Sequence, residues 1–155
     1  MTPLKKVYDA FLGRMTDDEW ELWTSNEVNE DWRTLLDAAI PWFRFPKKSL
    51  EIEENNFVSS LNNREIQILA TYMKVEWLNR VIMDWKNVKP LYDERDFSQA
   101  NLIDKFSNLL LQEKKNAKDY ESIYYRAIDN KPFPYQKLAG GKDEWLCGRY
   151  ERGIY

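Results

Sequence analysis

Residues 62–85 read NNREIQILATYMKVEWLNRVIMDW, and this stretch decides the fold. Asn62, followed three residues later by Glu65, is typical of a capping box at the start of a helix. Apolar side chains then recur at three- and four-residue spacing and cover most of the circumference of the predicted helix. A helix of this kind lies in the middle of a protein. We therefore expect a long helix, running to about Trp85, inside the domain core or between that core and a subunit interface.

A short helix is predicted at the start of the sequence. The Thr2 hydroxyl is predicted to cap this helix, and Pro3 is predicted to occupy its first position. Apolar side chains from Leu4 to Leu12 then fall on one helical face, and Gly13 is a plausible stop.

Another amphipathic helix is predicted over residues 32–43, and Pro41 should end or kink it. Ahead of it, Thr16 and Glu19 have the spacing of a capping box, with an irregular acidic loop as the alternative. After it, residues 44–60 lose the helical period. Alternating residues 50–53, with a turn at residues 55–56, predict a short hairpin or an irregular excursion there.

The longest predicted helix covers residues 99–128, with Ser98 as its cap. Thirty residues would span about 45 Å, which is longer than a compact domain of this size is wide. After Asp129, prolines and glycines exclude a regular helix. The fold class is therefore mainly α: a small helical bundle over residues 1–128, with one long C-terminal helix and the short excursion, followed by an extended C-terminal arm over residues 129–155.

The arm carries an apolar or aromatic residue every few positions, which is typical of a segment that lies on another surface. We expect it to dock on a neighbouring subunit, and folding back over its own domain is the alternative. Two tyrosines of the last helix are expected at the same interface. The predicted interface residues are Phe133, Tyr135, Leu138, Trp145, Leu146, Tyr150, Tyr155, Tyr120 and Tyr124.

Composition limits the function in several ways. Aromatic residues make up 15% of the chain, which suits either its core or a protein interface. The net charge of −3 argues against a protein that coats nucleic acid. Seven carboxylates and no Lys or Arg lie in residues 17–31, which indicates a solvated acidic face or a surface for a basic partner. Neither a signal peptide nor a membrane span is predicted.

Catalytic chemistry finds little support in the residues. The chain has no histidine, which removes the commonest general base and many metal ligands. Cys147 is the only cysteine, so the chain can form no internal disulfide and no Cys-His pair. Acidic residues cluster at 51–54 and 93–96 without a calcium-loop pattern. Lysines and carboxylates alternate in residues 113–121, which indicates an exposed face. We predict no enzyme activity, cofactor or metal.

Several segments together resemble the head-to-tail connector proteins of tailed phages, also called adaptor or neck proteins. The resemblance covers most of residues 4–142 and consists of packing and turn motifs. The segments that carry it are Val7–Leu12, Trp42–Pro46, Glu65–Arg80, Asp96–Asn101, Tyr124–Arg126 and Leu138–Lys142.

This resemblance implies a structural virion protein, made in the cytoplasm of the bacterial host and located in the neck. Such subunits form a ring, commonly twelvefold, that binds the portal protein on one side and the tail or a second neck protein on the other. DNA would pass through the lumen without specific binding, and residues 17–31 could line that lumen. A small acidic helical protein that binds or inhibits another protein is the alternative. A metal-dependent hydrolase using the acidic clusters is a third hypothesis.

Overall fold

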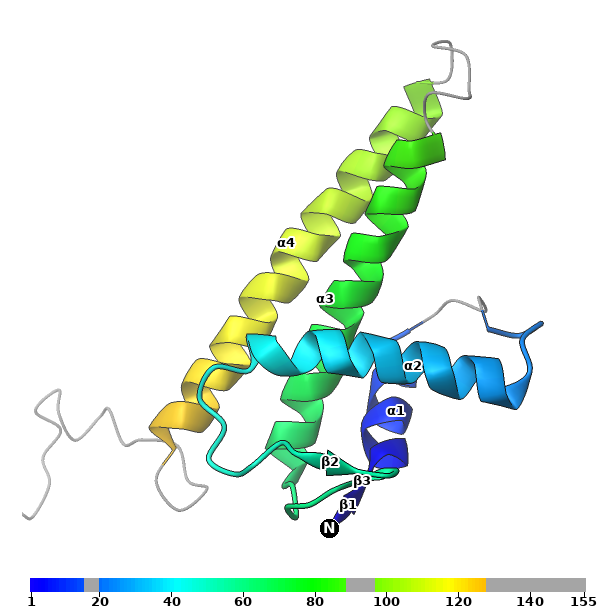
Figure 1. Cartoon of the computed structure of the whole chain (residues 1–155). Helices are drawn as coiled ribbons and strands as arrows, with labels where there is room; N and C mark the ends of the chain where they lie inside the picture. Colours follow the sequence, from blue (N-terminus) through cyan, green and yellow to red (C-terminus); the bar gives the residue numbers. More distant parts are fainter. Residues whose placement is uncertain (16–19, 89–96, 128–155) are drawn as a thin grey trace, which may run out of the picture. The chain divides into compact units, whose positions relative to one another are not determined.

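The structure is a computed structural model that describes residues 1–15, 20–88 and 97–127. It is mainly helical, as predicted, with a small antiparallel sheet at one end (Figure 1). In chain order the elements are β1 (Thr2–Pro3), α1 (Leu4–Leu12), α2 (Ser25–Ala39), a 3-10 turn η1 (Ile40–Trp42), β2 (Ile52–Glu53), β3 (Asn56–Phe57), α3 (Asn63–Val88) and α4 (Phe97–Arg126). Within the described residues, no helix combines the length and the apolar character needed to cross a membrane.

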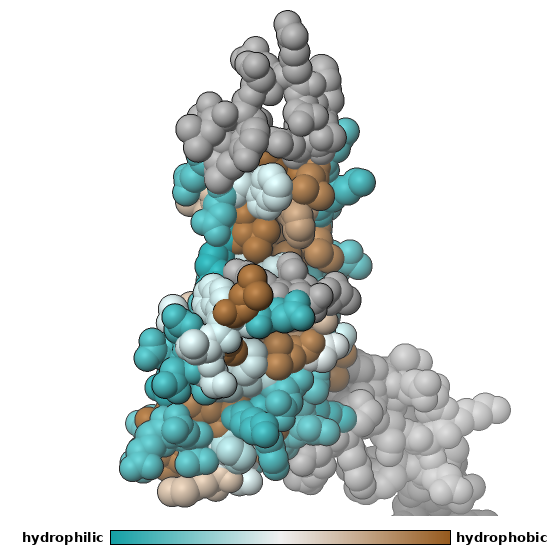
Figure 2. Space-filling model, turned by 90° about the vertical axis from the view of Figure 1, so that its right-hand side faces the viewer, coloured by the Kyte–Doolittle hydropathy of each residue, from teal (hydrophilic) through white to brown (hydrophobic). Residues whose placement is uncertain are grey.

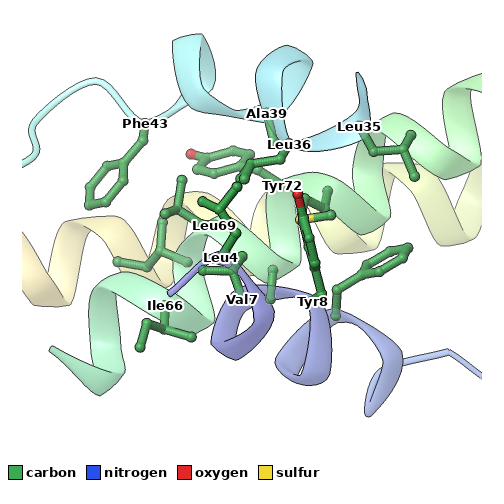
Figure 3. Packing of buried hydrophobic residues seen from close by; sticks show 14 of the residues in the cluster. Leu4, Val7, Tyr8, Leu35, Leu36, Ala39, Phe43, Ile66, Leu69 and Tyr72 are labelled. Atoms are coloured by element: carbon green, nitrogen blue, oxygen red, sulfur yellow. The ribbon is translucent and has the colours of Figure 1, made fainter. Parts of the chain in front are cut away.

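Helix α3 is the central element, which confirms the prediction from residues 62–85. Its capping box is formed: the Glu65 backbone N–H donates to Asn62 Oδ1 at 2.9 Å, and the Asn62 N–H donates to Glu65 Oε2 at 2.6 Å. Helices α1 and α2 pack on different sides of α3 (Figure 3). Leu69 in the second turn of α3 is fully buried between them. Apolar residues cover most of the circumference of α3 because this helix has neighbours on several sides.

One continuous core joins all the helices. Helix α4 contributes buried residues to it near its C-terminal end, and the rest of α4 lies along α3 with half-buried apolar side chains. The fully or nearly buried apolar residues of this core include Leu4, Val7, Phe11, Leu35, Leu36, Ala39, Phe43, Phe57, Ile68, Leu69, Tyr72, Met73, Leu78, Ala117 and Tyr124. Among the described residues, the listed core positions all precede residue 126.

The predicted cap at Thr2 is wrong, because this residue lies in strand β1. Thr2 pairs with Phe57 of β3, and β3 also pairs with β2, giving the order β1-β3-β2. The Thr2 hydroxyl accepts a hydrogen bond from the Leu61 backbone N–H at 2.8 Å, so it ties the start of the chain to the approach of α3. Pro3 occupies the N-cap position of α1 without a side-chain hydrogen bond. Gly13 follows the last residue of α1, as predicted.

The hairpin predicted in residues 44–60 is present, although its turn lies one residue earlier than expected. Strands β2 and β3 are joined by Glu54 and Asn55, and Asn56 already belongs to β3. Glu54 has a φ of 53°, a left-handed conformation that costs about 1–2 kcal/mol for a non-glycine residue. The Arg33 Nη1 atom donates to the Glu54 carbonyl at 3.4 Å and helps to hold this turn.

The remaining helix ends divide into confirmed and corrected predictions. Helix α2 begins at Ser25, earlier than the predicted start at residue 32. It ends at Ala39, as Pro41 predicts, and the 3-10 turn η1 follows. The capping box of α2 is formed by Thr24 and Glu27, and this box was not predicted. The predicted pair at 16 and 19 lies outside the described residues. Helix α4 begins at Phe97, so Ser98 is inside its first turn and is not the cap.

Candidate interaction surface

Two buried glutamates and two buried tyrosines meet where α3, α4 and the segment after η1 come together. We call this group, Glu65, Tyr72, Glu121 and Tyr124, the carboxylate–tyrosine cluster. Each of the four residues is at most 6% exposed. Buried carboxylates are rare unless they are paired or hydrogen-bonded, so their partners decide what the cluster does.

Glu121 receives three hydrogen bonds. Its Oε1 accepts from the backbone N–H groups of Arg44 at 2.7 Å and of Phe45 at 3.0 Å. Its Oε2 accepts from the Tyr72 hydroxyl at 2.7 Å. The residues after η1 are not in a helix or strand, so their N–H groups need an acceptor from elsewhere. Glu121 supplies it and fixes this segment to α4 and α3.

Glu65 and Tyr124 form a second set of hydrogen bonds, with Tyr124 one helical turn after Glu121 on α4. The Tyr124 hydroxyl donates to Glu65 Oε1 at 2.5 Å and accepts from the Lys47 backbone N–H at 3.0 Å. The Lys48 ammonium lies 3.7 Å from Glu65 Oε2. Burial, reinforced by the hydrogen bond to a carboxylate, raises the pKa of both Tyr72 and Tyr124. Both hydroxyls therefore stay protonated as donors, and the cluster acts as a set of structural hydrogen bonds.

The charged face predicted over residues 113–121 is exposed only in part, at Lys115, Lys118 and Asp119. Glu121 is buried in the cluster. Glu113 accepts from the Lys74 ammonium at 2.9 Å, and both of these side chains are less than a fifth exposed. The Lys114 ammonium lies 5.7 Å from the centre of the Trp42 ring. The alternation of signs reflects specific contacts with α3 and η1 as well as solvent exposure.

Metal ligation finds no support in the part of the chain that the structure describes. No group of three His, Cys, Asp or Glu side chains there is arranged to hold a metal ion. The acidic residues at 51–54 lie in and beside the β2–β3 hairpin without forming such a group. The acidic residues at 93–96 lie outside the described residues.

Exposed aromatic and apolar side chains flank the buried face of α4 at its C-terminal end. On one side are Tyr120, 45% exposed, and Ile123, 55% exposed. On the other side is Tyr125, whose ring centre lies 5.1 Å from that of Phe45, and both rings are more than half exposed. Because Glu121 holds the backbone of Phe45, the buried cluster also positions this exposed pair.

A groove of about 420 Å³ lies beside Tyr120 and Ile123; we call it the α3–α4 groove. Its lining residues are Arg14, Asn63, Arg64, Gln67, Ile68, Tyr120, Ile123 and Tyr124. Two of them are cationic and none is acidic. Arg14 donates from Nη2 to Gln67 Oε1 at 2.6 Å, and its guanidinium lies 5.9 Å from the centre of the Tyr120 ring. The Arg14 Nε–H is buried and finds no acceptor among the described residues.

A second hollow, of about 810 Å³, lies between α1, the first half of α2 and the hairpin. Charges of both signs line it, from Lys5 and Arg33 to Asp9 and Glu30. It therefore has no preference for a ligand of one charge.

The predicted interface residues fall into three groups. Tyr120 is exposed and lines the α3–α4 groove. Tyr124 is only 2% exposed and belongs to the core of its own chain, so it offers little surface to a partner. The other predicted residues, Phe133, Tyr135, Leu138, Trp145, Leu146, Tyr150 and Tyr155, lie outside the described residues, as do the predicted arm and its boundary at 128. Ile123, Phe45 and Tyr125 were not predicted; Ile123 and Tyr125 adjoin Tyr124 in the sequence, whereas Phe45 comes close only through the fold.

Comparisons with known protein families, with curated proteins and with solved structures find no match.

The acidic stretch over residues 17–31 is only partly a free surface. Asp31 accepts from the Trp20 Nε1–H at 2.8 Å and from both terminal nitrogens of Arg80, at 2.5 and 3.1 Å. Glu27 caps α2. Glu21 and Glu30 are exposed, and the carboxylates at 17–19 lie outside the described residues. Burial raises the pKa of Asp31, but the hydrogen bonds from Arg80 and Trp20 outweigh burial and leave the pKa below its ordinary value of 3.8.

A pH-dependent stability difference is expected between the native chain and Asp31→Asn. Because the folded-state pKa of Asp31 is lowered, its contribution is fully present above 3.8 and is lost as the pH falls through the folded-state value. At pH 7 the substitution should lower the free energy of unfolding by about 1 kcal/mol. Urea unfolding should show this difference shrinking below pH 3.8. A difference that is constant from pH 7 to pH 3 would contradict the assignment.

Proposed function

We propose that this chain is a non-enzymatic structural protein, a head-to-tail connector that forms a ring between the portal and the tail of a phage virion. The observation that carries the proposal is the set of exposed aromatic and apolar side chains at the end of α4, held in place by the carboxylate–tyrosine cluster. Rigid aromatic side chains on a surface favour protein–protein contacts because they lose little conformational entropy on binding. The resemblance of the packing motifs to connector proteins supplies the particular assembly.

Further exposed apolar residues support an assembling protein over a solitary one. Beyond α1 and α2, the helices α3 and α4 continue side by side (Figure 1), and apolar residues lie among hydrophilic ones along this part (Figure 2). Met83 on α3 is 57% exposed and Leu111 on α4 is 66% exposed. A ring subunit needs different patches for its two neighbours and its axial partners, and such patches are spread over this chain.

The alternative, an acidic protein that binds or inhibits another protein, is less well supported. Its main argument is the run of carboxylates in residues 17–31. Among the described residues of that run, Asp31 is held by Trp20 and Arg80, and Glu27 caps α2 although it is exposed like Glu21 and Glu30. A few exposed carboxylates make a weak attraction for a basic partner at physiological salt.

Removal of residues 129–155 tests the proposed role of the C-terminal segment. Since the core cluster found among the described residues is formed before residue 126, the shortened chain should keep its helical circular dichroism and its cooperative unfolding. It should nevertheless fail to bind the portal protein encoded in the same genome, whereas the full chain should cosediment with it.

Two results would contradict this proposal. A shortened chain that unfolds would mean that the segment belongs to its own core. A shortened chain that still binds the portal as well as the full chain would mean that the segment is not the connecting element.

A further inference from the structure

The turn that leads into α2 carries two exposed apolar side chains on a firmly anchored base. We call residues Glu21, Leu22 and Trp23 the 21–23 turn. Leu22 is 96% exposed and Trp23 is 42% exposed, and Glu21 beside them is also exposed. Large apolar side chains standing together on a surface are a frequent mark of a binding site.

The base of this turn is Trp20, which is 8% exposed. Its ring packs edge-on against Phe11 at 5.8 Å and against Trp32 at 6.0 Å, measured between ring centres. Its Nε1–H donates to Asp31, which Arg80 holds from α3. Within the turn, the Trp23 backbone N–H donates a hydrogen bond to the Trp20 carbonyl at 3.2 Å. The capping box at Thr24 fixes the end of the turn that leads into α2. An exposed segment fixed at both ends loses little entropy when it binds.

The α3–α4 groove has the complementary character. Its charged lining residues are Arg14 and Arg64, and the buried Arg14 Nε–H lacks an acceptor among the described residues. Two guanidinium groups with no carboxylate among the lining residues favour an anionic group in the groove. The same groove presents Tyr120 and Ile123 as a half-exposed apolar wall. A fitting ligand therefore combines a carboxylate with apolar side chains.

We infer that the 21–23 turn of one copy of this chain docks into the α3–α4 groove of the next copy. Leu22 and Trp23 would cover Tyr120 and Ile123, and the Glu21 carboxylate would face the guanidinium groups of Arg14 and Arg64. The inference deepens the proposed function and rests on it, since it names the contact by which subunits of the ring join.

The placement of the two surfaces makes this contact head-to-tail. The start of α2, which follows the 21–23 turn, lies on the right in Figure 1, whereas the end of α4, which lines the groove, lies at the lower left. Figure 2 looks onto the side of the molecule where α2 starts, and apolar side chains lie there among hydrophilic ones. Because the two patches are different, each copy keeps one free turn and one free groove until a ring closes.

Two variants separate the halves of the contact. In the turn variant, Leu22→Ser is combined with Trp23→Ser; in the groove variant, Ile123→Ser is combined with Arg64→Glu. All four side chains are exposed, so folding should be unaffected. Each variant alone should weaken self-association, measured by sedimentation velocity, by about tenfold or more. An equimolar mixture should give dimers that grow no further, because one intact turn meets one intact groove.

Val58→Ser is the matched control, since Val58 is an exposed apolar residue directly after β3 and lies outside the groove. It should assemble like the unaltered chain. As a second check, Glu21→Arg and Arg64→Glu should each weaken association, and the double variant should recover it.

The outcomes distinguish this inference from the proposed function. If the unaltered chain forms a ring on the portal and both variants do so equally well, the turn–groove contact is wrong and the connector proposal stands. A mixture of the two variants that stays monomeric, while the unaltered chain assembles, also overturns the contact. If the unaltered chain neither self-associates nor binds the portal, both ideas are wrong.

Discussion

Replacing Glu121 with alanine is expected to lower the free energy of unfolding by about 3 kcal/mol or more. The substitution removes the acceptor of three hydrogen bonds, from the backbone N–H groups of Arg44 and Phe45 and from the Tyr72 hydroxyl. These donors lie in a buried or half-buried site, so water cannot replace the carboxylate without rearrangement of the segment after η1. Urea unfolding at pH 7 measures the loss.

Asp119→Ala is the matched control for this substitution. Asp119 is two residues earlier on the same helix and is exposed, so its removal should change the free energy of unfolding by less than about 0.5 kcal/mol. Equal effects of the two substitutions would mean that Glu121 is not buried as described. A further consequence is local: Glu121→Ala should also increase hydrogen exchange at the Arg44 and Phe45 amides, because both lose their acceptor.

Leu69→Ala is expected to cost about 2–5 kcal/mol of unfolding free energy. Leu69 is fully buried on α3, with α1 and α2 packed around that helix (Figure 3). Truncation leaves a cavity at the junction of these helices, which the surrounding side chains fill only in part. Thermal or urea unfolding followed by circular dichroism measures the change.

Met83→Ala on the same helix provides the comparison. Met83 is 57% exposed and lies far along α3 from the sheet end, so its truncation should change the unfolding free energy by less than about 0.5 kcal/mol. The pair of substitutions therefore tests which face of α3 is buried. A loss at Met83 as large as that at Leu69 would contradict the exposure of Met83.

Much of the fold follows from local sequence signals. The capping box at Asn62 and Glu65 and the broad apolar stripe were enough to predict α3 and its central position. Gly13 and Pro41 mark the ends of α1 and α2 because each acts on its own stretch of backbone. The hairpin was also visible, since alternation of apolar and polar residues is a local pattern.

The parts that escaped prediction depend on contacts between distant residues. Thr2 and Leu61 are 59 positions apart, so nothing near Thr2 reveals that its hydroxyl accepts from that N–H. Glu121 sits among lysines and carboxylates in the sequence, and its backbone partners lie 76 and 77 positions away. A buried carboxylate that accepts hydrogen bonds from distant residues has the same local sequence pattern as an exposed carboxylate.

The candidate surface was predicted only in outline. An interface at the end of the last helix was expected, and Tyr120 is exposed there. Tyr124 was assigned to the same interface because it lies one helical turn further, but its hydroxyl bonds Glu65 and its ring packs on Phe43 within the core. Which of two neighbouring tyrosines faces solvent depends on the packing of α4 against α3, and spacing alone does not determine it.

The most direct test of the connector proposal is to mix the purified full chain with the portal protein encoded in the same genome and to image the product by electron cryomicroscopy. The proposal predicts an additional symmetric ring on one face of the portal, with neighbouring copies in head-to-tail contact. A portal without added density, together with a chain that stays a compact monomer at the same concentration, would contradict it.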